Sequence, residues 1–408
     1  MKFIVVLGDG MADYPLAELG NKTPLQAARK PNIDSLAAKG EVGLVKTIPD
    51  GMNPGSDTAN LSVMGYDPRK YYSGRSPLEA VSIGITLTDE DVTYRCNLVT
   101  LSDAGRYEDK VMVDYSADEI STPEADELIT FLSGHFKKMG VELYTGVSYR
   151  HCLVLRDAET GTGLTPPHDI SDKCVRDHLP QNGNSELLFQ MMKMSYDLLK
   201  DHPVNQKRIQ NGKRPANSVW FWGEGRKPAL SPFYDKYKKN GAVISAVDLI
   251  KGIAICAGMK SIDVPGATGN IDTNFDGKAA AALDALANDA DFVYIHLEAP
   301  DECGHRHEID NKVRAIELID EKVVGPIVNE MKNRQVDFSV MILPDHPTPL
   351  SLRTHTAEPV PYLIYRSNRE KESGAKYDET NAKQSGFFRP EGHLLLDYFF
   401  DMKEKKDV

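Results

Sequence analysis

Aspartate and histidine residues occur at several places in the chain with the spacing of metal ligands. Asp301 and His305 are four residues apart, so at the start of a helix both side chains would lie on one face. Asp345 and His346 are adjacent, and His355 follows in the next segment. Carboxylate oxygens and imidazole nitrogens together form the mixed ligand sets that hold divalent metal ions in proteins.

The aspartates of this set follow short apolar segments with the composition of buried strands. These segments span residues 3–7, 292–297 and 338–343. They are rich in Val, Ile, Leu and Phe, which is typical of strands that are buried on both faces of a parallel sheet. They lead to Asp9, Asp301 and Asp345, respectively. Because open parallel sheets bind ligands beyond the carboxyl ends of their strands, we expect these aspartates to meet at one edge of the sheet.

The number of candidate ligands predicts two metal ions. Six protein ligands around one ion would leave no open coordination position, and catalytic sites keep one open. Two ions about 3.5–4 Å apart can hold the attacking and leaving oxygens of an in-line displacement. The mixture of nitrogen and oxygen ligands suits Mn²⁺ or Zn²⁺ better than Mg²⁺. The candidate ligands are Asp9, Asp301, His305, Asp345, His346 and His355.

Ser56 is the candidate nucleophile. It follows the turn sequence Asn53-Pro54-Gly55 and could begin a helix, whose free backbone N–H groups favour a bound anion. A metal ion on its oxygen would stabilise the alkoxide, so no histidine base is required. The same position also fits a helix cap, and Thr58 is the alternative hydroxyl.

The size and charge of the chain limit its organisation and its partners. The 408 residues exceed the roughly 250–300 at which single cores stop growing, so we expect two domains. A net charge of −12 argues against a nucleic acid or an anionic membrane as partner. The five cysteines contain no CxxC pair, and no apolar run approaches a membrane span of about 20 residues, so we expect a cytoplasmic protein.

Strands and helices alternate in the outer parts of the chain but not in its middle. Helical patterns at residues 277–288 and 312–332 flank the second apolar strand, as in an α/β layer fold. The middle combines several strand patterns with two helical ones, at residues 123–139 and 185–199, which indicates an α+β domain. We therefore expect a discontinuous α/β core of residues 1–85 and 213–408, and an inserted α+β domain of residues 86–212.

An ordered series of motifs gives the chain a specific resemblance. The motifs are Gly8-Asp9-Gly10-Met11, Gly55-Ser56-Asp57-Thr58-Ala59-Asn60, Gly65-Tyr66-Asp67-Pro68, Tyr72-Ser73-Gly74-Arg75, Arg95-Cys96-Asn97, Glu298-Ala299-Pro300-Asp301-Glu302-Cys303-Gly304-His305 and Asp345-His346. Together they resemble the cofactor-independent phosphoglycerate mutases of the archaeal type, which belong to the alkaline phosphatase superfamily. The resemblance extends over nearly the whole chain.

The resemblance implies an alkaline-phosphatase-like core, with a mostly parallel sheet and helices on both faces, and an inserted cap domain that closes over the substrate. It implies an isomerase that interconverts 3-phosphoglycerate and 2-phosphoglycerate, a small phosphorylated metabolite, without 2,3-bisphosphoglycerate. It also implies a phosphoserine intermediate on Ser56. One metal ion is expected on Asp9, Ser56, Asp345 and His346, and a second on Asp301, His305 and His355.

A second activity stays open at this stage. Some relatives, which are also similar through His202-Pro203-Val204-Asn205, Arg208 and Trp220-Phe221-Trp222-Gly223-Glu224-Gly225, have been proposed as homoserine kinases. A metal-dependent phosphatase on the same fold is a third possibility. Arginine forks match phosphate and carboxylate groups. The candidate substrate-binding residues are Arg75, Arg95, Arg150, His151 and Arg208. The sequence leaves the oligomeric state open.

Overall fold

The computed structural model describes residues 1–103 and 105–402. The chain forms two compact units. The larger unit combines Met1–Tyr72 with Leu230–Val408, and the smaller unit is Ser73–Ala229. In the described part of the chain, no helix has both the length and the apolar composition needed to cross a membrane.

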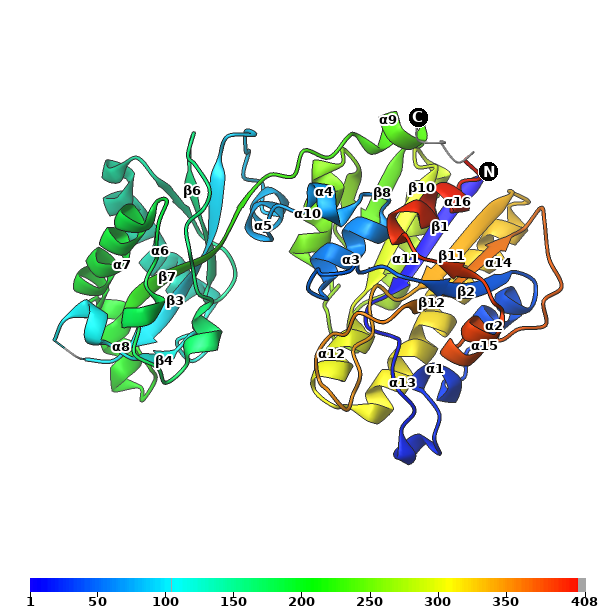
Figure 1. Cartoon of the computed structure of the whole chain (residues 1–408), viewed down its shortest axis with the longest axis horizontal. Helices are drawn as coiled ribbons and strands as arrows, with labels where there is room; N and C mark the ends of the chain where they lie inside the picture. Colours follow the sequence, from blue (N-terminus) through cyan, green and yellow to red (C-terminus); the bar gives the residue numbers. More distant parts are fainter. Residues whose placement is uncertain (104, 403–408) are drawn as a thin grey trace. The chain divides into compact units, whose positions relative to one another are not determined.

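The larger unit is built on an eight-stranded sheet with the order β13-β2-β12-β11-β1-β10-β8-β9 (Figure 1). Its central strand, β1 (Lys2–Gly8), is parallel to both β10 (Phe292–Leu297) and β11 (Phe338–Leu343). The remaining strands are β2 (Glu41–Val45), β8 (Gly241–Ile244), β9 (Lys260–Ile262), β12 (Val360–Arg366) and β13 (Phe388–Arg389). Among the described strands of this sheet, only β12 runs antiparallel to its neighbours, so the sheet is mostly parallel, as predicted.

Helices cover both faces of this sheet. One face packs its apolar side chains against α2 (Pro31–Ala38), α11 (Phe275–Ala287), α13 (Ile309–Leu318) and α14 (Gly325–Asn333). A π-helical turn at Ile319–Val324 joins α13 to α14. The other face contacts α3 (Ser56–Val63), α9 (Phe233–Tyr237) and α16 (Leu395–Phe399). The unit also contains α1 (Pro24–Ala27), α4 (Pro68–Tyr71), α10 (Asp248–Cys256), α12 (Ala299–His305) and α15 (Glu379–Gln384).

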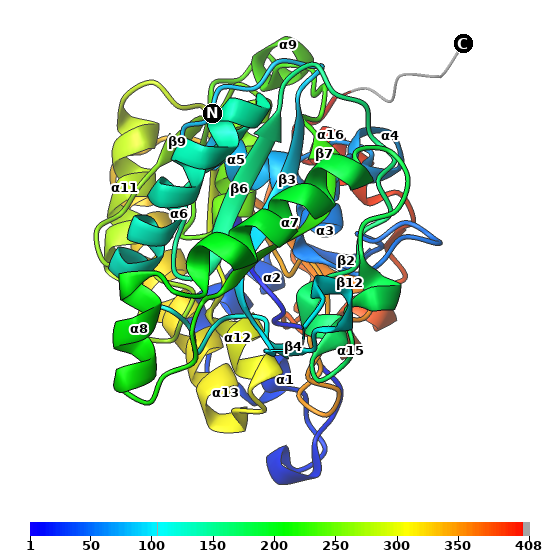
Figure 2. The same cartoon turned by 90° about the vertical axis from the view of Figure 1, so that its left-hand side faces the viewer.

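The smaller unit is an α+β unit with an antiparallel five-stranded sheet. Its strands are β3 (Val92–Leu101), β4 (Met112–Asp114), β5 (Glu142–Tyr144), β6 (Arg150–Leu155) and β7 (Ser218–Arg226). The helices are α5 (Ser76–Ser82), α6 (Thr122–Phe136), α7 (Ser185–Leu199) and α8 (Pro203–Gln210). Figure 2 shows α6 and α7 crossing one face of this sheet, where their apolar side chains form a common core with β3.

The inserted segment is longer at both ends than the expected residues 86–212. The strand β7 pairs along β3, and α5 contacts both of these strands, so both elements belong to the smaller unit. The expected boundaries after residues 85 and 212 therefore lie inside the smaller unit, which ends at Ala229. The reason is that β7 completes a sheet whose other strands lie far away in the sequence.

Candidate functional site

Three aspartates lie near the carboxyl ends of adjacent strands in the larger unit. Asp9 directly follows β1, Asp345 lies two residues beyond β11, and Asp301 belongs to α12, which follows β10. Because β1 is parallel to β10 and to β11, these strand ends lie at the same edge of the sheet. All three side chains are buried, so the edge carries several carboxylates that are shielded from water.

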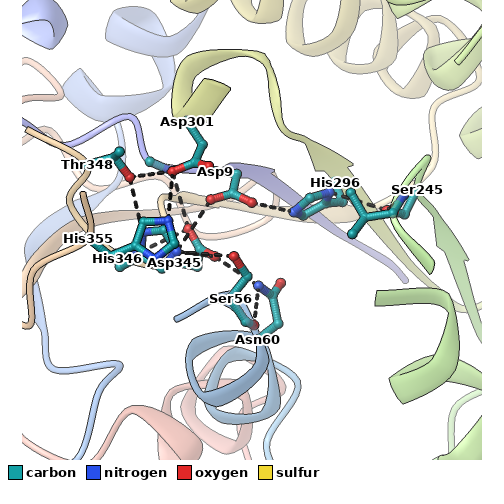
Figure 3. Close-up of polar contacts among 12 residues, drawn as sticks. Asp9, Ser56, Asn60, Ser245, His296, Asp301, Asp345, His346, Thr348 and His355 are labelled. Carbon is teal, nitrogen blue, oxygen red and sulfur yellow. Dashed lines mark hydrogen bonds and ion pairs between the residues drawn. The ribbon is translucent and has the colours of Figure 1, made fainter. Parts of the chain in front are cut away.

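Ligand-type atoms surround the Nε2 atom of His346 (Figure 3). The Oγ of Ser56 is 3.2 Å away, Oδ2 of Asp345 is 3.3 Å away and Oδ1 of Asp9 is 3.6 Å away. Ligands of a tetrahedral ion with bonds of about 2.1 Å are about 3.4 Å apart, so this spacing suits an ion between the atoms. We call Asp9, Ser56, Asp345 and His346 the inner cluster.

A second group, which we call the outer cluster, consists of Asp301, His305 and His355. The Nε2 of His305 is 3.2 Å from Oδ2 of Asp301 and 2.9 Å from Nε2 of His355. Oδ1 of Asp301 is 3.4 Å from the same His355 atom. The Nδ1 of His305 lies 3.0 Å from the carbonyl of Arg353, which can only accept a hydrogen bond. Nδ1 therefore carries a hydrogen, so Nε2 is the ring atom that could bind a metal ion in place of a proton.

By distance alone, His346 could join either cluster. Its ring centroid is 4.0 Å from that of His355, and ligand atoms of Asp301, His346 and His355 also lie within 4.8 Å of one another. The hydroxyl of Thr348 donates to Asp301, so it accepts from Nδ1 of His346, 3.3 Å away. Nε2 of His346 is then unprotonated and faces the inner cluster. We therefore assign His346 to the inner cluster.

The electrostatics of the site favour bound cations. Burial, together with the charges of Asp345 and Asp301, raises the pKa of Asp9 well above its usual range. Burial alone would raise the pKa of Asp301 too, but hydrogen bonds from His305 and His355 lower it well below. The hydrogen bond with Asp301 raises the pKa of His305 to about 9. Oδ1 of Asp9 is buried and has no hydrogen-bond partner in the described part of the chain, so this donor set fits a divalent metal ion.

Ser56 is the first residue of α3, and its hydroxyl faces the inner cluster. The preceding residue, Gly55, is the N-cap, with extended backbone and no side-chain cap. The Ser56 hydroxyl contacts the ring of His346 instead of a backbone N–H group. Among the described residues, Thr58 makes no corresponding contact and is buried. The geometry thus favours a reactive hydroxyl over the alternative role of Ser56 as a helix cap.

Three residues that the sequence did not single out hold the ligands of these clusters. Thr348 links His346 to Asp301, as described above. The amide of Asn60, one helical turn after Ser56, donates to Oδ2 of Asp345 over 2.9 Å. Nε2 of His296 lies 3.0 Å from Oδ2 of Asp9. Burial lowers the pKa of His296 to about 3, so its ring is neutral at pH 7. The signals in the sequence were a histidine within an apolar strand and the place of Asn60 in the motif that contains Ser56.

Some of the predicted substrate-binding residues lie together in the smaller unit. Glu79 accepts from Arg75 over 2.7 Å and pairs with Arg95 over 3.0 Å. The Arg95 guanidinium also lies 4.2 Å from the centroid of the Trp222 ring. Arg150 of β6 pairs with Asn97, two residues from Arg95 on β3, so both arginines lie on one face of the sheet. This face therefore carries two of the predicted substrate-binding arginines.

His151 and Arg208 do not share that face. His151 pairs with Cys96, which places its side chain on the opposite face from Arg95, and its Nδ1 accepts from the backbone of Gly146. Arg208 is only 1% exposed. Its guanidinium donates to the carboxylate of Glu124 and to two backbone carbonyls. These contacts bind the smaller unit together, so we leave both residues out of the proposed substrate site.

The chain is similar to a described protein family and to several named proteins. A family model described as 2,3-bisphosphoglycerate-independent phosphoglycerate mutase matches residues 37–205. A protein of that name from Methanothrix thermoacetophila is 48% identical, over 97% of this chain and 98% of the relative. Another, from Methanosarcina acetivorans, is also 48% identical, over 95% of this chain and 96% of the relative.

Solved structures agree with these relatives. The cofactor-independent phosphoglycerate mutase of Thermoplasma acidophilum is 27% identical, with a TM-score of 0.69 over 98% of this chain and 99% of the other. A protein from Pyrococcus horikoshii is 29% identical, with a TM-score of 0.81 over 100% and 99% of the two chains. With its sequence relatives matching over nearly their full length, the chain belongs to the 2,3-bisphosphoglycerate-independent phosphoglycerate mutase family.

Proposed function

We propose that this chain interconverts 3-phosphoglycerate and 2-phosphoglycerate through a phosphoserine at Ser56, without 2,3-bisphosphoglycerate. The observation that supports this most directly is the Ser56 hydroxyl, which lies 3.2 Å from Nε2 of His346 at the start of α3. It is the hydroxyl in the inner cluster, and the family to which the chain belongs carries out this isomerisation. The five cysteines are free thiols, which suits a reducing cytoplasm.

Two divalent metal ions would be held by the inner and outer clusters. The ligands of the first are Asp9, Ser56, Asp345 and His346, and those of the second are Asp301, His305 and His355. Their mixture of imidazole and carboxylate groups suits Mn²⁺ or Zn²⁺. Bound there, the ions supply Lewis acidity, which favours the alkoxide of Ser56 and neutralises charge on a phosphoryl group.

The residues of the chain then position the reacting groups. The Asn60 amide donates to the Ser56 carbonyl over 2.8 Å and so holds the first turn of α3 in place. The Ser56 oxygen forms a bond to phosphorus while the bond between phosphorus and the glycerate oxygen breaks, and the serine proton ends on that oxygen. The other hydroxyl of glycerate then takes the phosphoryl group from Ser56, and the serine regains a proton.

The smaller unit is proposed as the cap domain that binds the anionic substrate and excludes water from the phosphoserine. Its supporting feature is the arginine set Arg75, Arg95 and Arg150. Glu79 and Trp222 hold the first two of these side chains in defined orientations. Arginine is suited to this role because its planar fork pairs with carboxylate and phosphate oxygens.

An enolase-coupled assay with 3-phosphoglycerate and Mn²⁺ tests the proposal. Ser56→Ala should lower kcat/KM by at least about 10³-fold while leaving the thermal unfolding midpoint unchanged. Ser62→Ala is the matched control, because Ser62 lies on the same helix and its buried hydroxyl has no hydrogen-bond partner among the residues that the structure describes. Phosphate release and homoserine-plus-ATP assays are run in parallel. A wild-type chain without mutase activity at any Mn²⁺ concentration, or an active Ser56→Ala variant, would refute it.

A further inference from the structure

The buried strand β10 carries two polar side chains, Tyr294 and His296, in an otherwise apolar sequence. They are two residues apart, so they project from the same face of the sheet. Both are completely buried. Each makes a hydrogen bond toward the inner cluster, although neither belongs to the ligand set described above. Burying a polar group in a strand costs free energy unless the group is hydrogen-bonded, so these hydrogen bonds stabilise the folded chain.

The direction of the hydrogen bonds at His296 follows from its neighbours (Figure 3). Nε2 of His296 lies 3.0 Å from Oδ2 of Asp9, and it donates to this oxygen when Asp9 is ionised, as it would be as a metal ligand. Nδ1 of the neutral ring must then accept. The Ser245 hydroxyl lies 3.3 Å from Nδ1 and itself accepts from the backbone N–H of Val247 over 2.9 Å. The backbone of Val247 thus orients Ser245, whose hydroxyl can donate to Nδ1 in this tautomer of His296.

His296 also determines the orientation of the Asp9 carboxylate. Its Oδ2 contacts His296, whereas its Oδ1 has no hydrogen-bond partner among residues 1–103 and 105–402 and lies 3.6 Å from Nε2 of His346. The histidine therefore decides which oxygen of Asp9 faces the inner cluster. The side chain is held in the orientation of a ligand that presents one oxygen.

Tyr294 orients the Asp345 carboxylate of the inner cluster indirectly, through hydrogen bonds to and from Asn60. Its hydroxyl donates to Oδ1 of Asn60 over 2.5 Å, which fixes the orientation of the amide. The two N–H bonds of Asn60 then go to the Ser56 carbonyl, over 2.8 Å, and to Oδ2 of Asp345, over 2.9 Å. The tyrosine therefore couples the position of Asp345 to the start of the helix that carries the nucleophile.

We propose that Tyr294 and His296 are positioning residues that set the orientation of Asp345 and Asp9 before a metal ion binds. This inference rests on the proposed ion at the inner cluster. Groups that orient metal ligands in this way typically change metal affinity by about 10–100-fold when they are removed. Because both residues extend from one strand, a single rigid element would define the geometry of both carboxylates.

The test uses the full-length chain after removal of metal by a chelator, with Mn²⁺ alone as the probe in isothermal titration calorimetry. His296→Phe and Tyr294→Phe should each weaken one of two Mn²⁺ sites by about 10–100-fold. Mutase activity should fall at low Mn²⁺ and recover at high Mn²⁺. His296→Gln should restore part of the affinity, because its amide can donate to Asp9. Ser245→Ala should have a smaller effect in the same direction.

Two matched controls separate positioning from loss of buried polar groups. Ser339→Ala, in the neighbouring strand β11, removes a buried hydroxyl that has no hydrogen-bond partner within the described chain. Tyr362→Phe removes a buried phenol hydroxyl that bonds Glu41 in the same sheet. Neither should change Mn²⁺ affinity. Thermal unfolding of the metal-free proteins should show the same cooperative transition for the His296, Ser245 and control variants as for the wild type.

Unchanged Mn²⁺ affinity in both His296→Phe and Tyr294→Phe would overturn the inference, as would equal losses in the controls. If His296→Phe fails to fold, Ser245→Ala and Tyr294→Phe decide the matter. The affinity measurement does not depend on catalysis. A wild-type chain that binds two Mn²⁺ ions but lacks mutase activity would therefore refute the proposed function and leave this inference open to the same titration.

Discussion

The inner and outer clusters hold similar side chains in different ways. In the inner cluster the side chains of Asp9, Asp345 and His346 are at most 2% exposed. In the outer cluster the side chains of His305 and His355 are 34% and 22% exposed. Inner ligands receive hydrogen bonds from buried side chains of β10 and α3, whereas His305 is oriented by a backbone carbonyl.

This difference predicts that the two proposed metal ions would be held with different strengths. Buried ligands that are oriented before binding lose little freedom when an ion arrives, so the inner cluster should bind tightly. Half-exposed rings remain accessible to water and to exchange. We therefore expect the outer ion to leave first when a chelator is added, and the inner ion to depend more strongly on the surrounding protein.

The largest expected effect is at the inner cluster. Asp345 accepts from the backbone N–H groups of Gly10 and His346 and from Asn60. Asp345→Asn places an N–H group among these donors and removes a ligand charge. It should lower kcat/KM by about 10³-fold or more, without recovery at high Mn²⁺, in the enolase-coupled assay. Asp337→Asn, at an exposed position just before β11, is the control. If the kcat/KM of Asp345→Asn recovers at high Mn²⁺, the predicted difference between the inner and outer clusters is wrong.

A buried ion pair supports the segment around Thr348, the residue that links His346 of the inner cluster to Asp301 of the outer cluster. Nζ of Lys312 lies 2.7 Å from Oδ2 of Asp13, both side chains are fully buried, and Lys312 also donates to the Thr348 carbonyl. Lys312→Met leaves the charge of Asp13 unpaired and should lower the free energy of unfolding by about 3–5 kcal/mol. Urea denaturation measures this change.

The matched variant for this ion pair is the double substitution Lys312→Met with Asp13→Asn. It removes both charges and should recover much of the stability that the single variant loses. A single variant as stable as the wild type would show that the pair does not hold the segment between the clusters.

A smaller effect is expected at the outer cluster. His305→Ala removes one half-exposed ligand and should weaken one Mn²⁺ site by about 10²-fold. Because the inner cluster stays intact, activity should return at high Mn²⁺, in contrast to Asp345→Asn. Calorimetry and activity as a function of Mn²⁺ concentration measure both. His135→Ala, in α6 of the smaller unit, should leave both quantities unchanged. If the activity of His305→Ala does not return at high Mn²⁺, the predicted difference between the two clusters is wrong.

The smallest expected effect is a change of stability with pH. It depends on Glu379, which accepts a hydrogen bond from the backbone of Asp13. Burial raises the pKa of Glu379 to about 7, although the carboxylate accepts from Thr23 and from the backbone of Asp13. A raised folded-state pKa contributes stability below the unfolded value, near pH 4.5, and this contribution is lost as pH rises through about 7. Relative to Glu379→Gln, the wild type should therefore lose about 1–3 kcal/mol between pH 4.5 and 8.

Urea unfolding of both proteins at several pH values in this range measures that loss. Glu372→Gln, at an exposed position, provides the control and should follow the wild type at every pH. A difference between the wild type and Glu379→Gln that does not vary with pH would contradict the prediction.

The sequence predicted the composition of the smaller unit but not all of its strand pairings. Its α+β composition was readable from the alternation of strand and helix patterns. The membership of β7 was not, because its pairing with β3 joins residues that are more than a hundred positions apart. The same holds for His151 and Arg208, since the register of β6 on β3 and the burial of α8 determine where their side chains lie.

For the candidate metal site, the sequence by itself determined which aspartates would come together. The physical reason is general: apolar runs form a parallel sheet, and parallel strands deliver their carboxyl ends to one edge. Tertiary structure alone decided the rest. It placed Gly55 at the cap position and freed the Ser56 hydroxyl to face His346. It also brought His296 and Asn60 onto the carboxylates, because hydrogen bonds between distant segments depend on packing that no local pattern records.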